Sequence, residues 1–236
     1  MLMAVVAVAL VVRAGHVMQT SGTSLNAHGA TAIRVLAVGS SVAEGWVDPH
    51  GGGYLKRAFA GLSSADHVPY ELINKSAAGD TVGKISAQYL SWLRAEHPTI
   101  VVLSWGALDD LHNGTPRQAF YRDIQAEIRA ALQAKAVVFV VTPPVTAASY
   151  KGYRLKEPAL LHGETAAASA LQSRNVYVFD VFTQMKQYLA HHGQTYVPYM
   201  ADGWHPNARG HALAGNLLLQ DIRHQFGTQD IRFHSS

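Results

Sequence analysis

Two short segments of this chain combine residue types that can transfer protons and form covalent bonds. The first is Gly39-Ser40-Ser41, where the glycine permits a sharp exit from a strand and a serine can stand at the tip of the turn. The segment is equally compatible with a serine that only caps a helix. The second is Asp202-Gly203-Trp204-His205, in which a carboxylate three residues before a histidine can turn back to the imidazole. Hydroxyl, imidazole and carboxylate groups together suit nucleophilic catalysis.

Two further segments combine polar residues with glycine, and each follows a predicted strand. Asn74-Lys75-Ser76-Ala77-Ala78-Gly79-Asp80-Thr81 comes after the second strand, and Trp105-Gly106-Ala107-Leu108-Asp109-Asp110 comes after the third. In open α/β sheets, ligands bind outside the carboxyl ends of the strands, at the point where the strand order reverses. We therefore expect these segments to meet at one edge of the sheet.

Taken in chain order, the four segments resemble the four sequence blocks of the SGNH hydrolases, the GDSL-like lipases and esterases, from about Ile33 to about Phe226. The resemblance implies a flavodoxin-like α/β/α sandwich whose five-stranded parallel sheet has the strand order 2-1-3-4-5. It also implies a serine esterase with Ser41 as nucleophile and Asp202 and His205 as its partners. The chemistry agrees, because a serine hydroxyl is a poor nucleophile until a base accepts its proton, and a carboxylate holds the histidine tautomer.

The resemblance further implies an oxyanion hole made by the backbone N–H groups of Ser41 and Gly79 and by an asparagine side chain. The third segment departs from the family here, because either Leu108 or, with one extra residue, Asp109 occupies the asparagine position. We favour Asp109, which can donate a hydrogen bond only when protonated. The prediction is a raised pKa for Asp109 and activity that favours acid, with Asn113 as an alternative donor.

The first segment also departs from the family, because Ser40 stands where an aspartate is usual. Ser40 is itself the alternative nucleophile if the turn is shifted by one residue. Two tryptophans in the motif segments, Trp105 and Trp204, are candidates either for the walls of an acyl pocket or for ordinary core aromatics.

The alternation of short β-branched runs with amphipathic helical patterns from Ile33 onward predicts a parallel sheet with helices on both faces. A helix capped by Thr81, a helix opened by Thr115 and Pro116, and a last helix starting at Pro206 are expected between or after the strands. The predicted strands are Ile33 to Val38, Tyr70 to Asn74, Ile100 to Ser104, Val137 to Val141 and Val176 to Phe179.

The stretch 142–164 has no clear periodicity and contains Pro143, Pro144 and Pro158. A connection of this length inside a compact domain is usually functional, so we predict a loop on the substrate side. With 236 residues, 48% of them hydrophobic, the chain is long enough for one sizeable core. We expect a single catalytic domain over residues 32–236.

Residues 1–31 are expected to lie outside that domain. Met1 to Val12 is an almost uninterrupted apolar run, shorter than a bilayer span, and Ala14 to Thr31 is rich in small and polar residues. We interpret this segment as a signal sequence or membrane anchor followed by a tether, with a buried first strand as the alternative. The enzyme is therefore expected to be extracytoplasmic, either secreted or attached to a membrane.

Composition narrows the partners and cofactors. The chain has no cysteine, and its 19 Lys and Arg against 16 Asp and Glu form no basic run, so we expect no nucleic-acid partner. The 13 histidines lack metal-ligand spacing, and Gly51-Gly52-Gly53 is not followed by the Lys-Ser/Thr of a phosphate loop. No metal and no nucleotide cofactor is predicted.

Substrate identity stays open at this point, because one fold accommodates many acyl substrates. The leading prediction is hydrolysis of short acyl or acetyl esters, either small molecules or glycans. The alternatives are an acyltransferase or deacetylase that acts on cell-surface polysaccharide, and an inactive carbohydrate-binding module of the same fold.

Overall fold

The computed structural model describes residues 32–227, 229 and 231–235, so the predicted signal segment and tether lie outside the described residues. The strands form one parallel sheet in the order β2-β1-β3-β4-β5, which confirms the predicted topology. They are β1 (Ile33–Gly39), β2 (Tyr70–Asn74), β3 (Ile100–Ser104), β4 (Val137–Val141) and β5 (Val176–Phe179).

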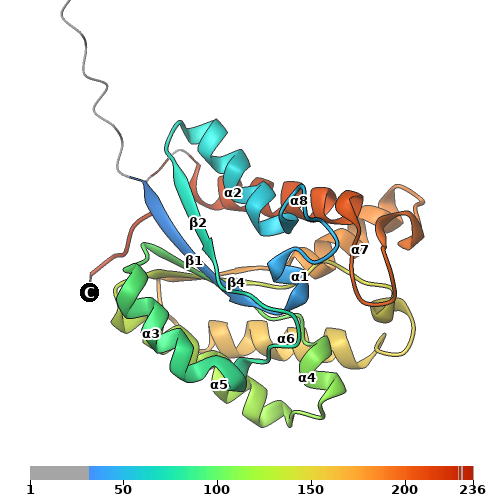
Figure 1. Ribbon diagram of the computed structural model, residues 1–236, viewed down its shortest axis with the longest axis horizontal. Helices are drawn as coiled ribbons and strands as arrows, with labels where there is room; N and C mark the ends of the chain where they lie inside the picture. Colours follow the sequence, from blue (N-terminus) through green and yellow to red (C-terminus); the bar gives the residue numbers. More distant parts are fainter. Residues whose placement is uncertain (1–31, 228, 230, 236) are drawn as a thin grey trace, which may run out of the picture.

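Helices cover both faces of the sheet, as Figure 1 shows: α2 and α8 lie on one face with α7 beside α8, and α3, α5 and α6 lie on the other. Every residue of β3 and β4 is buried, because parallel strands covered on both faces must be apolar throughout. The α-helices are α1 (Ser41–Glu44), α2 (Gly53–Asp66), α3 (Ser86–Glu96), α4 (Leu108–His112), α5 (Arg117–Gln133), α6 (Lys156–Ser169), α7 (Val181–His191) and α8 (Ala208–Phe226). Short 3-10 helices are η1 (Val82–Ile85), η2 (Ala148–Tyr150) and η3 (Val197–Tyr199).

The predicted loop over residues 142–164 is only partly correct. Its first part is irregular apart from η2, whereas its last part belongs to α6, which begins at Lys156. Pro158 misled the sequence interpretation. This proline lies in the first turn of α6, where a backbone N–H has no acceptor within the helix and its loss costs little.

Two helix starts also differ from the predictions. Thr81 precedes the 3-10 helix η1 and makes no side-chain capping bond, and α3 begins only at Ser86. The last helix begins at Ala208, two residues after Pro206, because the side chain of Asn207 accepts a hydrogen bond from the Gly210 N–H and caps α8.

None of the helices in the described part of the chain combines the length and the apolar character that crossing a membrane requires.

Candidate active site

The turn after β1 places Ser41 at the carboxyl edge of the sheet. Gly39 pairs with Ser104 of β3, and a Cβ added to Gly39 would lie 2.1 Å from the Ser104 carbonyl oxygen. A glycine is therefore required by the close approach of two strands. Ser41 follows as the first residue of α1, with 7% of its surface exposed.

His205 and Asp202 face Ser41 from the segment before α8. His205 Nε2 lies 3.1 Å from Ser41 Oγ, and His205 Nδ1 lies 2.9 Å from Asp202 Oδ2 and 3.0 Å from Oδ1. The three residues predicted from the four sequence segments are thus within hydrogen-bonding distance in one chain of contacts. Ser40 is buried beside them, but its hydroxyl lies near Gly106 and bonds to Asp109, and His205 Nε2 contacts the Ser41 hydroxyl instead.

The segment carrying Asp202 and His205 is held by backbone and side-chain bonds. The Ala201 N–H donates to the His205 carbonyl oxygen at 3.0 Å, and Met200 forms an antiparallel bridge with Pro206. The Asn207 amide donates to the carbonyl oxygen of Met200 at 3.1 Å, so the start of α8 fixes the segment. These contacts preorganise the imidazole relative to the nucleophile.

Hydrogen bonds stabilise the ionised form of Asp202. Partial burial tends to raise the pKa of Asp202, but hydrogen bonds from the His205 ring and from the backbone N–H groups of Trp204 and His205 outweigh it and lower that pKa. An ionised carboxylate against Nδ1 assigns the ring proton to that nitrogen and leaves Nε2 free to accept a proton. The arrangement can therefore deprotonate the Ser41 hydroxyl.

Asp109 lies in the first turn of α4 and lines the same small pocket as Ser41. Burial raises the pKa of Asp109, while a hydrogen bond with the Ser40 side chain and the nearby His205 and His112 act in the opposite direction. The direction is the predicted one and favours the protonated form that can donate. Its role as an oxyanion donor stays a prediction.

Three other residues were considered for the oxyanion hole, namely Leu108, Asn113 and Gly79. Leu108 also lines the pocket and contributes an apolar wall, whereas Asn113 is exposed at the end of α4. Gly79 has a positive φ of 76°, which favours glycine, and it lies in the turn after β2. The contribution of its N–H group to the site stays a prediction.

A small pocket includes the nucleophile. It is a small cavity of about 10 Å³, roughly the space of one water molecule. A larger hollow runs along α2 and β2 and includes neither Ser41 nor His205. The lining of the small pocket consists of Ser40, Ser41, Val42, Gly106, Leu108, Asp109, Pro143, Thr146, Glu157 and Trp204.

Trp105 and Trp204, which the sequence analysis did not distinguish, have different environments in the structure. Trp105 is a core residue, 1% exposed, whose indole N–H donates to Glu127 Oε2 at 2.8 Å. Trp204 lines the pocket and contacts the rings of Tyr153 and His112 edge to face. Of these two tryptophans, Trp204 is therefore the one that a bound acyl group can contact.

Trp46 and Glu157 were missed by the sequence interpretation. Trp46 is 48% exposed, its ring centroid lies 6.3 Å from that of His205, and its carbonyl oxygen lies 3.3 Å from His211 Nε2. Glu157 lines the pocket from the start of α6. Trp46 is recognised as part of the site by its exposure beside His205, and Glu157 by its burial in the pocket lining. Neither exposure nor burial can be deduced from residue type.

Among residues 32–227, 229 and 231–235, no group of three or more histidine, cysteine, aspartate or glutamate side chains could hold a metal ion.

The parallel sheet and the serine, histidine and aspartate at its carboxyl edge define the class of the protein, an α/β-fold carboxylic ester hydrolase. The model of the GDSL-like lipase/acylhydrolase family matches residues 37–213, and the chain belongs to this family. The match includes all four motif segments.

Solved structures show the same fold at low sequence identity. An acetylxylan esterase from Geobacillus stearothermophilus is 15% identical, with a TM-score of 0.66 over 82% of this chain and 95% of that one. A lipolytic protein of the G-D-S-L family from Veillonella parvula is 18% identical, with a TM-score of 0.64 over 79% and 96%. An α/β hydrolase from the metagenome of Lake Arreo, Spain, is 18% identical, with a TM-score of 0.66 over 81% and 95%. No curated protein sequence matches the chain.

Proposed function

We propose that this esterase hydrolyses short acyl esters through an acyl-enzyme on Ser41, with His205 as the base and Asp202 as its orienting carboxylate. The observation that carries the proposal is the continuous contact from Ser41 Oγ to His205 Nε2, at 3.1 Å, and from His205 Nδ1 to Asp202, at 2.9 Å. These are the distances that proton transfer between nucleophile and base requires.

In the acylation half, Ser41 Oγ attacks the ester carbonyl carbon while its proton moves to His205 Nε2. The tetrahedral intermediate then loses its alkoxy group, whose oxygen receives that proton from His205. In the second half, His205 accepts a proton from water and the water oxygen attacks the acyl carbon. The bond to Ser41 Oγ then breaks as His205 returns that proton to the serine oxygen, which restores the free enzyme. Asp202 stabilises the imidazolium in both halves.

The negative oxygen of each tetrahedral intermediate needs fixed donors. As the first residue of α1, Ser41 has a backbone N–H group for which the helix provides no acceptor. Gly79 and protonated Asp109 are the further donors of the proposal. Removal of one oxyanion donor typically raises the barrier by about 2.7 to 4 kcal/mol.

The size of the pocket supports a short acyl group such as acetyl. The space beside Ser41 is about that of one water molecule, so a long acyl chain would have to lie elsewhere. A second candidate substrate, an acetylated glycan, is favoured by Trp46, because an exposed indole 6.3 Å from the His205 ring can stack on a sugar ring. One of the structures that share the fold is described as an acetylxylan esterase.

Burst kinetics with p-nitrophenyl acetate tests the proposal. The intact protein should release a burst of p-nitrophenol equal to the enzyme concentration, and Ser41→Ala should abolish it. Ser40→Ala should keep a burst, which separates Ser41 from the alternative nucleophile, and Ser64→Ala on the exposed face of α2 is a matched control. No turnover at any pH from about 4 to about 9 would refute the esterase and favour a binding module.

Added acetyl acceptors distinguish hydrolysis from transfer. Faster release of p-nitrophenol with a glycan acceptor, together with a new glycan ester, would indicate an acyltransferase.

The proposed extracytoplasmic location rests on the apolar run Met1 to Val12, and fractionation of cells that express the full chain tests it.

A further inference from the structure

The alcohol side of a bound ester must lie beside the His205 ring, because His205 gives its proton to the departing alkoxy oxygen. The exposed Trp46 ring lies on this side of the site, with its centroid 6.3 Å from that of the imidazole. The small pocket beside Ser41 is lined by neither Trp46 nor His205, so it suits the acyl side. An alcohol larger than one sugar residue would therefore extend past Trp46.

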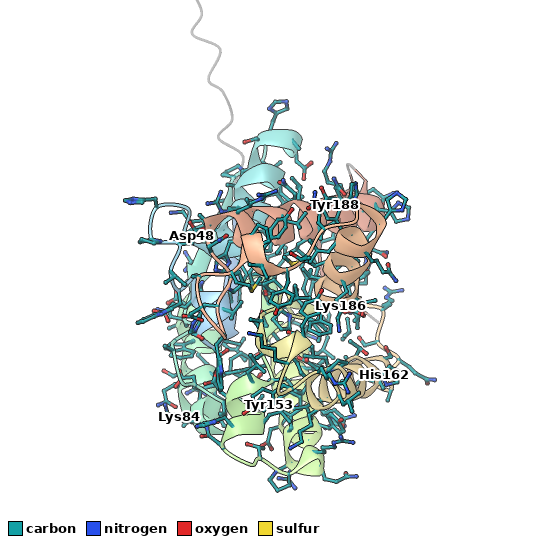
Figure 2. The ribbon with its side chains drawn as sticks, turned by 90° about the vertical axis from the view of Figure 1, so that its right-hand side faces the viewer. Asp48, Lys84, Tyr153, His162, Lys186 and Tyr188 are labelled. Atoms are coloured by element: carbon teal, nitrogen blue, oxygen red, sulfur yellow. The ribbon has the colours of Figure 1, made fainter. Side chains whose placement is uncertain are left out.

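Two adjoining hollows begin at Trp46. The first, of about 590 Å³, lies at the loop between α1 and α2, and Trp46 and Asp48 contribute to its lining. Figure 2 labels Asp48 in this loop, at one edge of the molecule. The second, of about 610 Å³, runs along α2 and β2, and it adjoins the first because Glu44 and Gly52 line both. We call this second hollow the α2 groove; its lining includes Glu44, Gly52, Lys56, Ala60, Tyr70 and Asn74.

The α2 groove starts beside the nucleophile turn and leads away from it. At the carboxyl end of β2, the Asn74 amide donates to the Ala43 carbonyl oxygen of α1 at 2.8 Å. Tyr70 begins β2 four residues earlier, which is about 13 Å at the rise of a strand. Tyr70, Leu72 and Asn74 are alternate residues, so they face the same side of the strand and line one wall. A hollow of about 610 Å³ has the size of a small-molecule binding site.

The loop between the active site and the α2 groove is held in place by buried contacts. Asp48 is 1% exposed, accepts a hydrogen bond from the Gly53 N–H at 3.3 Å and pairs with Arg57 at 3.0 Å. His211 Nε2 lies 3.3 Å from the Trp46 carbonyl oxygen and links the loop to α8. A surface formed in advance loses little conformational entropy when a ligand binds.

The α2 groove contains one carboxylate and one ammonium group that are both available to a ligand. Glu44 and Lys56 are exposed, and neither side chain forms a hydrogen bond or an ion pair with any residue that the structure describes. Sugar hydroxyls can donate to a carboxylate and accept from an ammonium group, in charge-assisted bonds that are stronger than neutral ones. A long acyl chain would offer no partner to either charge and would displace their water. The two charges cancel, which favours an uncharged ligand.

We propose that the α2 groove is a binding site for a glycan chain, in which Glu44 and Lys56 bind hydroxyl groups of the sugar residues that follow the acetylated one past Trp46. The inference rests on the proposed esterase function and takes up its second candidate substrate. Binding energy from these remote sugars orients the ester at Ser41. Chain length should therefore influence the rate, although the reacting ester is the same.

The test compares sugars that carry a single acetyl group. The substrates are an acetylated monosaccharide and the tetrasaccharides acetylated at one end or at the other, in a β-1,4-linked xylose series and a β-1,4-linked glucose series. The ratio of kcat/KM, tetrasaccharide over monosaccharide, should be about tenfold or more for at least one tetrasaccharide. The gain should appear mainly in KM, because the remote sugars do not react.

Substitutions in the α2 groove should remove this advantage of chain length. Ala60→Trp fills the groove from an exposed position of α2 and should lower the ratio to near one. Lys56→Met keeps most of the stem, loses the charge and should lower the ratio about threefold. Both substrates are measured on the same variant, so a loss of folded enzyme cancels in the ratio. Ala126→Trp, exposed on α5 at the other face of the sheet, is the matched control and should keep the ratio.

Two results would overturn the inference while the esterase proposal stands. One is hydrolysis of p-nitrophenyl acetate with a ratio near one, or with no sugar ester hydrolysed, in both series. The other is an unchanged ratio in Ala60→Trp. A loss in that variant with p-nitrophenyl octanoate, and none with the tetrasaccharides, would assign the α2 groove to an acyl chain instead. Absence of turnover with every ester would refute the esterase proposal and this inference together.

Discussion

Replacement of Asp202 by asparagine is expected to reverse the tautomer of His205 while it leaves the backbone of the segment in place. Asp202 Oδ1 accepts hydrogen bonds from the backbone N–H groups of Trp204, at 2.7 Å, and His205, at 2.8 Å. In Asp202→Asn the amide oxygen should keep both bonds. The amide NH₂ group then takes the place of Oδ2, 2.9 Å from His205 Nδ1, and donates to it.

The magnitude follows from what that donation does to the other ring nitrogen. When Nδ1 accepts, the ring proton moves to Nε2, which then cannot take the proton of Ser41 Oγ from 3.1 Å away. The same change in the serine-protease triad lowers kcat by about 10⁴. The Asp202 side chain is 50% exposed, so water can partly compensate, and we expect a loss of about 10³ to 10⁴, or about 4 to 5.5 kcal/mol.

Acyl-enzyme formation by Asp202→Asn with p-nitrophenyl acetate, followed in a stopped-flow instrument, measures this loss. Asp66→Asn, at the C-terminal end of α2, is the matched control and should behave as the intact enzyme. Circular dichroism and the urea midpoint should stay unchanged in both variants. If Asp202→Asn kept more than about a tenth of the acylation rate, the carboxylate would not set the His205 tautomer, and the proton-transfer argument would be refuted.

Two further predictions concern carboxyl groups whose pKa is raised by partial or full burial. Because burial raises the pKa of Asp109, activity that needs its protonated form should decline as the pH rises through that pKa. The variant Asp109→Asn should retain or increase kcat/KM near neutral pH. Complete loss of its activity at every pH would contradict the proposed donor. Burial also raises the pKa of Glu127 from an ordinary value of 4.5 to about 8, against the hydrogen bond from Trp105 Nε1. The folded state therefore binds the proton more tightly than the unfolded state, and the free energy of unfolding should fall as the pH rises from about 4.5 to about 8, by on the order of a few kcal/mol from this group. Glu127→Gln should remove that part of the slope in urea titrations at several pH values, and an unchanged slope would show that Glu127 does not titrate this way.

Residue patterns that depend on local periodicity predicted the fold well. All five strands occur within one residue of their predicted bounds, because buried parallel strands appear as continuous β-branched runs. Helix starts were less accurate where a proline or a 3-10 turn intervenes. The start of α6 could not be recognised, since the stretch before Pro158 has no period and its burial depends on neighbours distant in sequence.

The candidate site, too, could be predicted from the sequence only in part. Spacing alone allowed Asp202 to reach His205, because both lie within four residues of one segment, and resemblance assigned Ser41 over Ser40. Only the folded chain places Ser41 Oγ against His205 Nε2, across 164 positions of sequence, and directs Ser40 elsewhere. The assignment of Asp109 depends in the same way on the burial that raises its pKa.

By itself, then, the sequence determined the five strands and the polar segments that follow them, because these are short-range patterns. The sheet order and the family followed from the resemblance of the four segments to the SGNH hydrolases. The tertiary structure decided which side chains at the site are exposed and which are buried. Trp46 is exposed beside His205, and Glu157 is buried in the lining of the pocket that includes Ser41. Exposure and hydrogen-bond satisfaction depend on what the rest of the chain packs against a residue, and no local pattern encodes them.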